Sequence, residues 1–274
     1  MRFRVSVAVV SGALAATALA APAAQAADGQ SARSAVKGFA ATADDIRDGD
    51  TRITGVSING GKPIVLGVSE KKKVTATITA TDSKGIRVGG AWLWRGKSAG
   101  KATDGILADK QEFSCSNQGT KGTCKVTFTL DPTKLYINDR AGAWKLAVFA
   151  EGKDADGEVK FNYRTVTLQR ASKLTVNAAP EPVVKGKTLT VTGALTRANW
   201  ESLNYKGYTA QPVKLQYRAK NATSYTTLKT VKTDSKGNLK TTVKATADGY
   251  YRYAFAGTST TPAVTTAGDF VDVR

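Results

Sequence analysis

The sequence contains no histidine, only two cysteines and a single methionine among 274 residues. Histidine is the usual general base beside a serine or cysteine nucleophile, and it is the commonest metal ligand. Its absence excludes Ser-His-Asp and Cys-His catalysis and every His-based metal site. No glycine-rich phosphate loop occurs either. The sequence therefore predicts a protein without a catalytic centre, cofactor or metal, although a Ser–Lys nucleophile or a carboxylate pair would not need histidine.

The two cysteines, Cys115 and Cys124, flank a short segment with glycines at its centre, which is typical of a β-hairpin. Cysteines that face each other across a hairpin lie within disulfide range. The alternative is metal ligation, but two thiolates alone do not complete a zinc site. The spacing predicts a disulfide, which indicates an oxidising compartment.

The N-terminus has the pattern of a secretory signal. Arg2 and Arg4 precede an apolar run, and Ala24-Gln25-Ala26 provides small residues for cleavage. A retained membrane helix is the alternative, but the run is shorter than the roughly 20 residues that a span requires. We therefore expect a signal peptide over 1–26, a secreted extracellular protein without a transmembrane segment after cleavage, and only non-covalent attachment to the cell wall.

Basic residues outnumber acidic ones, 40 to 22, and the formal net charge is +18. Such a balance suits either a soluble alkaline protein or one that attracts polyanions. The acidic residues fall mainly in expected turns. Asp44, Asp45, Asp48 and Asp50 could suggest calcium, but they lack the glycine and terminal glutamate of an EF-hand loop, and a solvated turn is the simpler interpretation.

Short runs with two-residue alternation predict β-strands throughout the rest of the chain. In one run Val74, Ala76 and Ile78 alternate with threonines, and Asp-Gly turns separate neighbouring runs. The expected organisation is a flexible leader over 27–50 and two antiparallel β-sandwiches of the immunoglobulin-like (Ig-like) type over 51–170 and 171–274. The predicted strands are 53–58, 73–81, 90–94, 112–116, 123–130, 143–150 and 158–168, then 173–177, 187–196, 212–218, 225–233, 238–245, 249–256 and 269–273.

The two halves share sequence, since Thr-Asp-Ser-Lys-Gly occurs at both Thr81–Gly85 and Thr233–Gly237. The stretch Pro212–Gly257, with Lys-Leu-Gln-Tyr-Arg and Tyr-Arg-Tyr-Ala-Phe-Ala-Gly, resembles the Ig-like modules of secreted actinobacterial proteins. That resemblance covers most of the second half and implies a sandwich used outside the cell as a spacer, adhesion or ligand-binding module. It carries no agreed chemistry, so no functional residue is transferred.

A long connection over 197–211 carries Trp200, Tyr205 and Tyr208 among polar residues. Loops at the end of a sandwich often carry binding sites, and exposed rings there could stack on sugars. The other interpretation is a small satellite core that caps the sandwich. Both remain open at this point.

Basic residues also share a predicted sheet face. If Val213, Leu215 and Tyr217 point inward, then Lys214 and Arg218 point outward, and Arg252 does so on the neighbouring strand. Such a face could hold phosphate or sulfate, or it could simply keep the protein soluble. The predicted partner is an anionic cell-wall polymer, a glycan or an extracellular protein, without specific nucleic-acid recognition, and the chain is expected to be monomeric.

The sequence thus favours a secreted, non-enzymatic binding or adhesion protein. Its proposed ligand contacts are Trp200, Tyr205, Tyr208, Lys214, Arg218 and Arg252. The alternatives are a structural spacer without a ligand of its own, a secreted inhibitor that presents the Cys115–Cys124 hairpin, and a hydrolase.

Overall fold

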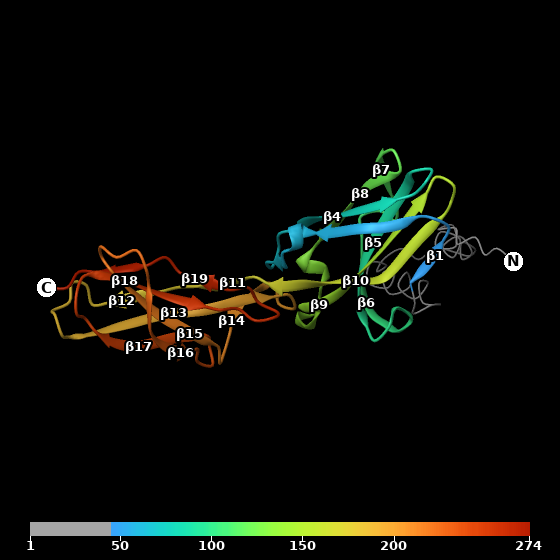
Figure 1. Ribbon diagram of the computed structural model, residues 1–274. Helices are drawn as coiled ribbons and strands as arrows, with labels where there is room; N and C mark the ends of the chain where they lie inside the picture. The colour runs from blue at the N-terminus through green and yellow to red at the C-terminus, as the bar shows by residue number, and fades with distance from the viewer. Residues whose placement is uncertain (1–44) are drawn as a thin grey trace. The chain divides into compact units, whose positions relative to one another are not determined.

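The computed structural model describes residues 45–274, and these form an all-β protein with four short 3-10 turns (Figure 1). The predicted signal peptide and residues 27–44 of the predicted leader lie outside the described residues. No helix in the described part of the chain is long and apolar enough to cross a membrane. The chain divides into two compact units, described here one at a time; the first contains residues 45–64, 71–134 and 143–168 and the second residues 65–70, 135–142 and 169–274.

The first unit is an Ig-like sandwich whose strands follow one continuous order, β1-β10-β9-β5-β7-β8-β4-β2, with β3 on β10 and β6 on β5. The layers β2-β4-β8-β7 and β10-β9-β5 are joined where Phe113 and Ser114 of β7 pair with β5, while the rest of β7 pairs with β8. This is the ABED and CFG arrangement of immunoglobulin domains. The strands are β1 (Ile46–Asp48), β2 (Arg52–Ile58), β3 (Ile64–Leu66), β4 (Lys72–Thr81), β5 (Ile86–Gly96), β6 (Ala102–Leu107), β7 (Phe113–Gln118), β8 (Lys121–Leu130), β9 (Gly142–Gly152) and β10 (Gly157–Arg170).

The core of this unit follows the alternation in the sequence. Val74, Ala76 and Ile78 are buried while their threonine neighbours are more exposed, as predicted. Trp144 lies in the same interior. Trp92 and Trp94 are also buried, but they form a separate cluster with Phe149 and Phe161 on the other face of β5 and β9.

The predicted disulfide is present. Cys115 on β7 lies directly opposite Cys124 on β8, and their Cα atoms are 4.2 Å apart. Two adjacent antiparallel strands, β7 and β8, are therefore covalently joined.

Strand β1 was not expected, because residues 27–50 were assigned to a leader. It pairs with β10, and Arg47 donates to Glu158 Oε1 from Nη2 at 2.8 Å and from Nε at 3.1 Å. The backbone N–H of Ile53 donates to Glu158 Oε2 at 2.6 Å. Burial raises the pKa of Glu158, but these hydrogen bonds outweigh it, and the net effect is a lowered pKa. Residues 46–48 thus belong to the folded first unit and not to a leader.

The second unit is also an Ig-like sandwich. Strand β13 pairs with β11, β12, β14 and β17 in one sheet, and the other has the order β16-β15-β18 with β19 and β20 on β18. Its core contains residues from both sheets, among them Leu189, Val191, Val213, Leu215, Tyr253 and Phe255. The strands are β11 (Ser172–Leu174), β12 (Asn177–Ala179), β13 (Thr188–Asn199), β14 (Asn204–Gly207), β15 (Pro212–Ala219), β16 (Thr226–Lys232), β17 (Asn238–Lys244), β18 (Gly249–Phe255), β19 (Val264–Thr265) and β20 (Asp269–Val271).

The repeated Thr-Asp-Ser-Lys-Gly sequence folds into the same turn at two different connections. The side chains of Asp82 and Asp234 each accept a hydrogen bond from the backbone N–H of the lysine two residues later. The backbone carbonyl of each aspartate accepts a second bond from the N–H of the glycine three residues later. Both glycines have φ of +85°. At Gly237 an added Cβ would also lie 2.6 Å from the Leu195 carbonyl oxygen, so only glycine fits there.

Candidate functional site

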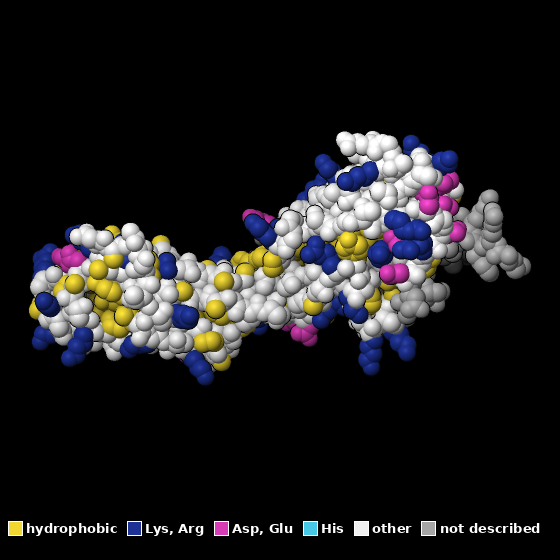
Figure 2. All heavy atoms as spheres, viewed as in Figure 1, with side chains coloured by type: hydrophobic (Ala, Val, Ile, Leu, Met, Phe, Trp, Pro, Cys, Tyr) yellow, Lys and Arg dark blue, Asp and Glu magenta, His cyan; other side chains and the backbone are white. Residues whose placement is uncertain are grey.

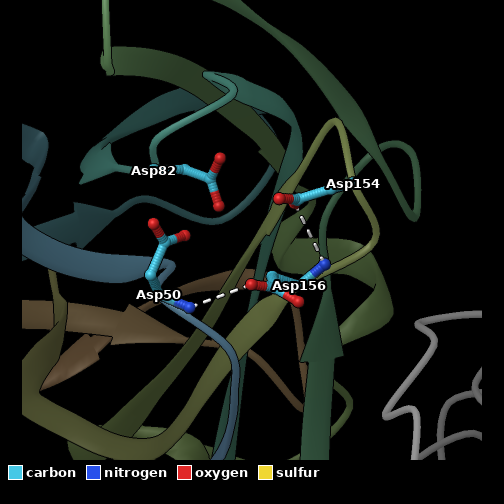
Figure 3. Close-up of side chains that lie close together, drawn as sticks. All are labelled: Asp50, Asp82, Asp154 and Asp156. Carbon is cyan, nitrogen blue, oxygen red and sulfur yellow. Dashed lines mark hydrogen bonds between the residues drawn. The ribbon is translucent and has the colours of Figure 1, made fainter.

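Four aspartates gather at one end of the first unit (Figure 3). Asp50 lies between β1 and β2, Asp82 follows β4, and Asp154 and Asp156 belong to the turn between β9 and β10. One oxygen from each carboxylate lies within 4.8 Å of the others. Of the four aspartates considered in the sequence as a calcium turn, Asp50 alone belongs to this group.

Hydrogen bonds within the group account for much of its geometry. The Asp50 N–H donates to Asp156 Oδ2 at 2.9 Å, and the Thr51 hydroxyl donates to buried Asp82 Oδ2 at 2.5 Å. A hydrogen bond from the Ser83 side chain lowers the pKa of Asp50. Carboxylate oxygens are the ligands that calcium prefers, but calcium takes six to eight of them. The cluster could hold a hard cation. Hydrogen bonds from neighbouring N–H and O–H groups account for the positions of the carboxylates equally well, so we assign no metal to it.

The aromatic connection over 197–211 is a β-hairpin and not a loop, because β13 continues to Asn199 and β14 returns from Asn204. Of the two interpretations of Trp200, the exposed stacking ring is contradicted and the satellite core agrees with the structure. Its side chain is 1% exposed, and its indole N–H donates to the Gly67 carbonyl at 2.9 Å. Its backbone N–H bonds Asn138 Oδ1 at 3.0 Å. Trp200 is therefore a buried residue that lies outside the main core cluster of the second unit, in agreement with the interpretation as part of a small satellite core.

Tyr205 and Tyr208 are both half-buried, and each already has a cation against its ring. Lys173 Nζ lies 4.0 Å from the Tyr205 ring centre, and Arg197 Cζ lies 3.9 Å from that of Tyr208. Burial raises the pKa of Tyr205. Because Trp200 is buried, it cannot stack on a sugar together with these two rings.

The predicted basic face is present on the sheet that β15, β16 and β18 form. Val213 and Leu215 are buried, so the side chains of Lys214, Gln216 and Arg218 point to the other side of β15. Arg252 lies beside Gln216 on β18. None of the three strands contains an acidic residue. In Figure 2 the visible side of the second unit likewise shows many more basic than acidic side chains.

Aromatic rings hold the two arginines of this face. Arg252 Cζ lies 3.6 Å from the centre of the Tyr225 ring, and Arg218 Cζ lies 5.3 Å from the same ring. Arg218 Cζ also lies 4.2 Å from the centre of the Tyr250 ring, and the centres of the Tyr250 and Phe270 rings are 5.1 Å apart. Each such cation–π contact contributes about 0.5–1 kcal/mol at exposed sites. We call the outward residues the cationic face: Lys214, Gln216, Arg218, Tyr225, Tyr250, Arg252 and Phe270.

Part of this face was missed in the sequence. Tyr250 could have been placed there, because it stands two residues before Arg252 on a regular strand. Tyr225 could not, because it precedes β16, and the pairing of β16 with β15 shifts register between Leu215 and Gln216. Local alternation carries no information about such a shift.

Comparisons with protein families and with curated proteins find no match. Among solved structures, the three N-terminal domains of the highly immunogenic outer capsid protein Hoc of bacteriophage RB49 align at 9% identity with a TM-score of 0.31, covering 82% of this chain and 70% of that three-domain chain. The D0-D1 domain of intimin aligns at 12% identity with a TM-score of 0.26, covering 80% of this chain and 98% of that chain. A putative membrane anchored protein from Corynebacterium diphtheriae aligns at 12% identity with a TM-score of 0.30, covering 80% of this chain and 53% of that chain. TM-scores this low carry no argument about function. The class of protein is defined by the strands themselves: an all-β chain with two Ig-like units.

Proposed function

We propose that the protein is a secreted, non-enzymatic binding module that attaches to an extracellular anionic polymer through the cationic face of its second unit. One observation carries this proposal: Arg218 on β15 and Arg252 on β18 both contact the Tyr225 ring, and neither of these two strands contains a carboxylate. In a structural spacer, basic residues on such a face would need no aromatic support.

Charge elsewhere in the chain supports the same function. The formal net charge of +18 falls only to +16 if Arg2 and Arg4 leave with a signal peptide. A basic protein attracts polyanions over a distance of about 10 Å at moderate salt, and the local face then determines where they bind. The proposed site of action is the extracellular space or the cell wall.

The experiment compares two charge reversals in the complete processed protein. R218E/R252E changes the cationic face, and K240E/K244E is the matched control on β17 in the other sheet of the same unit. Both variants lower the net charge by the same amount. Binding to immobilised dextran sulfate is measured over a salt series, with neutral dextran as the blank.

We expect R218E/R252E to lose nearly all binding at moderate salt while the control keeps most of it. The slope of log K against log salt should also fall by about 2 in magnitude in R218E/R252E, roughly one for each lost contact. Equal losses in both variants would show that only net charge matters. Binding that rising salt leaves unchanged would exclude an electrostatic attachment.

A further inference from the structure

The hydrogen bonds that Arg218 makes to described residues leave both donors on one edge of its guanidinium available to a ligand. Its Nη1 donates to the carbonyls of Ala222 at 2.6 Å and Lys220 at 3.4 Å. Its Nε and Nη2 have no hydrogen bond to another described residue. These two atoms form the side edge of the guanidinium, which is the geometry that binds an oxyanion with two parallel hydrogen bonds.

Arg252 is held differently but keeps a matching pair of donors. Its Nε donates to Gln216 Oε1 at 2.8 Å, and its guanidinium stacks closely on Tyr225. Within the described part of the chain, Nη1 and Nη2 have no hydrogen-bond partner. They form the end edge of the guanidinium, which also binds an oxyanion through two donors.

Both arginines contact the Tyr225 ring, so the two guanidinium edges with available donors lie close to the same ring. Neither forms an ion pair with a described carboxylate. Since the rings and the neighbouring carbonyls and amide already fix both guanidiniums, an arriving ligand would not have to order them. Less conformational entropy would then be lost on binding.

The directions of the acceptors on the ligand decide which anion fits two such edges. A carboxylate has two oxygens in one plane, and a guanidinium edge that pairs with both leaves acceptor sites only in that same plane. A phosphate or sulfate ester is tetrahedral and presents two or three unesterified oxygens in different directions, so it can accept from both arginines at once. We infer that Arg218 and Arg252, supported by Tyr225, form a site for phosphate or sulfate esters carried by the polymer. This inference rests on the proposed function and specifies its ligand class.

The test uses three anionic polymers of matched chain length at one salt concentration: dextran phosphate, dextran sulfate and poly-L-glutamate. The wild-type protein should bind at least one of the first two about tenfold more tightly than poly-L-glutamate. The ester polymer that binds more tightly shows whether the site prefers phosphate or sulfate. Poly-L-glutamate binding as tightly as both esters would overturn the inference.

Lysine variants separate this inference from the proposed function. R218K/R252K keeps both charges but removes the paired donors, so binding to the ester polymers should weaken about tenfold while poly-L-glutamate binding changes little. The control K240R/K244R should bind all three polymers as the wild type does. If R218K/R252K binds as the wild type while R218E/R252E does not, the cationic face binds by charge alone and the inference fails, but the proposed function stands. If R218E/R252E also binds as the wild type, both fail.

Discussion

Replacement of Trp200 by alanine distinguishes a core residue from a ligand contact. The indole is 1% exposed in the second unit, and its N–H donates to the Gly67 carbonyl. Truncation of a buried tryptophan to alanine costs about 3–5 kcal/mol, which includes the lost apolar burial and the cavity left behind. The free energy of unfolding of the second unit should fall by that amount, which is a large part of the stability of a small domain.

The assay is urea unfolding followed by far-ultraviolet circular dichroism, because tryptophan fluorescence would itself change with the substitution. The two units are fitted as separate transitions, since a chain with two units need not unfold in one step. Trp200→Phe is the matched variant: it keeps an apolar ring but leaves the Gly67 carbonyl without its donor, so it should cost less, about 1–3 kcal/mol.

The opposite pattern would refute this reasoning. If Trp200→Ala leaves the stability of the second unit unchanged and abolishes binding to an anionic polymer, the residue acts at the surface and the core assignment is wrong. The cationic face would then be the wrong location for the site as well.

Three further predictions concern stability. Because the pKa of Glu158 is lowered in the folded protein, its contribution is complete above the ordinary value of 4.5 and is lost as pH falls below it; Glu158→Gln should therefore flatten the acid limb of a stability–pH curve, and an unchanged limb would contradict the role of this carboxylate. Gly237→Ala should greatly lower the melting temperature, whereas Gly119→Ala, where an added Cβ meets nothing within 4 Å, should lower it much less; equal shifts would show that close backbone contact is unimportant. Replacement of Cys115 and Cys124 together by alanine should cost about 2–3 kcal/mol, measured by denaturant unfolding without reductant, and no loss would mean that the bond does not constrain the unfolded chain.

The sequence predicted what depends on neighbours along one strand. Alternation gave the buried side of β4 and the outward direction of Arg218 and Arg252, and the hairpin around Cys115 and Cys124 gave the disulfide. Each of these needs only the two-residue period or a short turn. The sequence could therefore locate most strands and half of the cationic face.

What failed depends on contacts between distant segments. Trp200 is buried because Gly67 and Asn138, far away in the sequence, supply its partners, and nothing local marks that contact. Tyr225 reaches both arginines because of a shift in strand register. The aspartate cluster likewise combines three separate turns. Alternation cannot predict such arrangements, because it indicates which side of the sheet a residue faces but not which distant residues pack against it.

The most direct measurement of the central claim is a nuclear magnetic resonance titration of the complete isotope-labelled protein with short dextran phosphate or dextran sulfate chains. Backbone amide shifts and the arginine side-chain Nε–H signals would be followed together. The account predicts changes concentrated on β15, on β18 and around Tyr225, with the Arg218 and Arg252 Nε–H signals among those that move. Changes spread evenly over the basic residues of both units, or confined to the first unit, would contradict it.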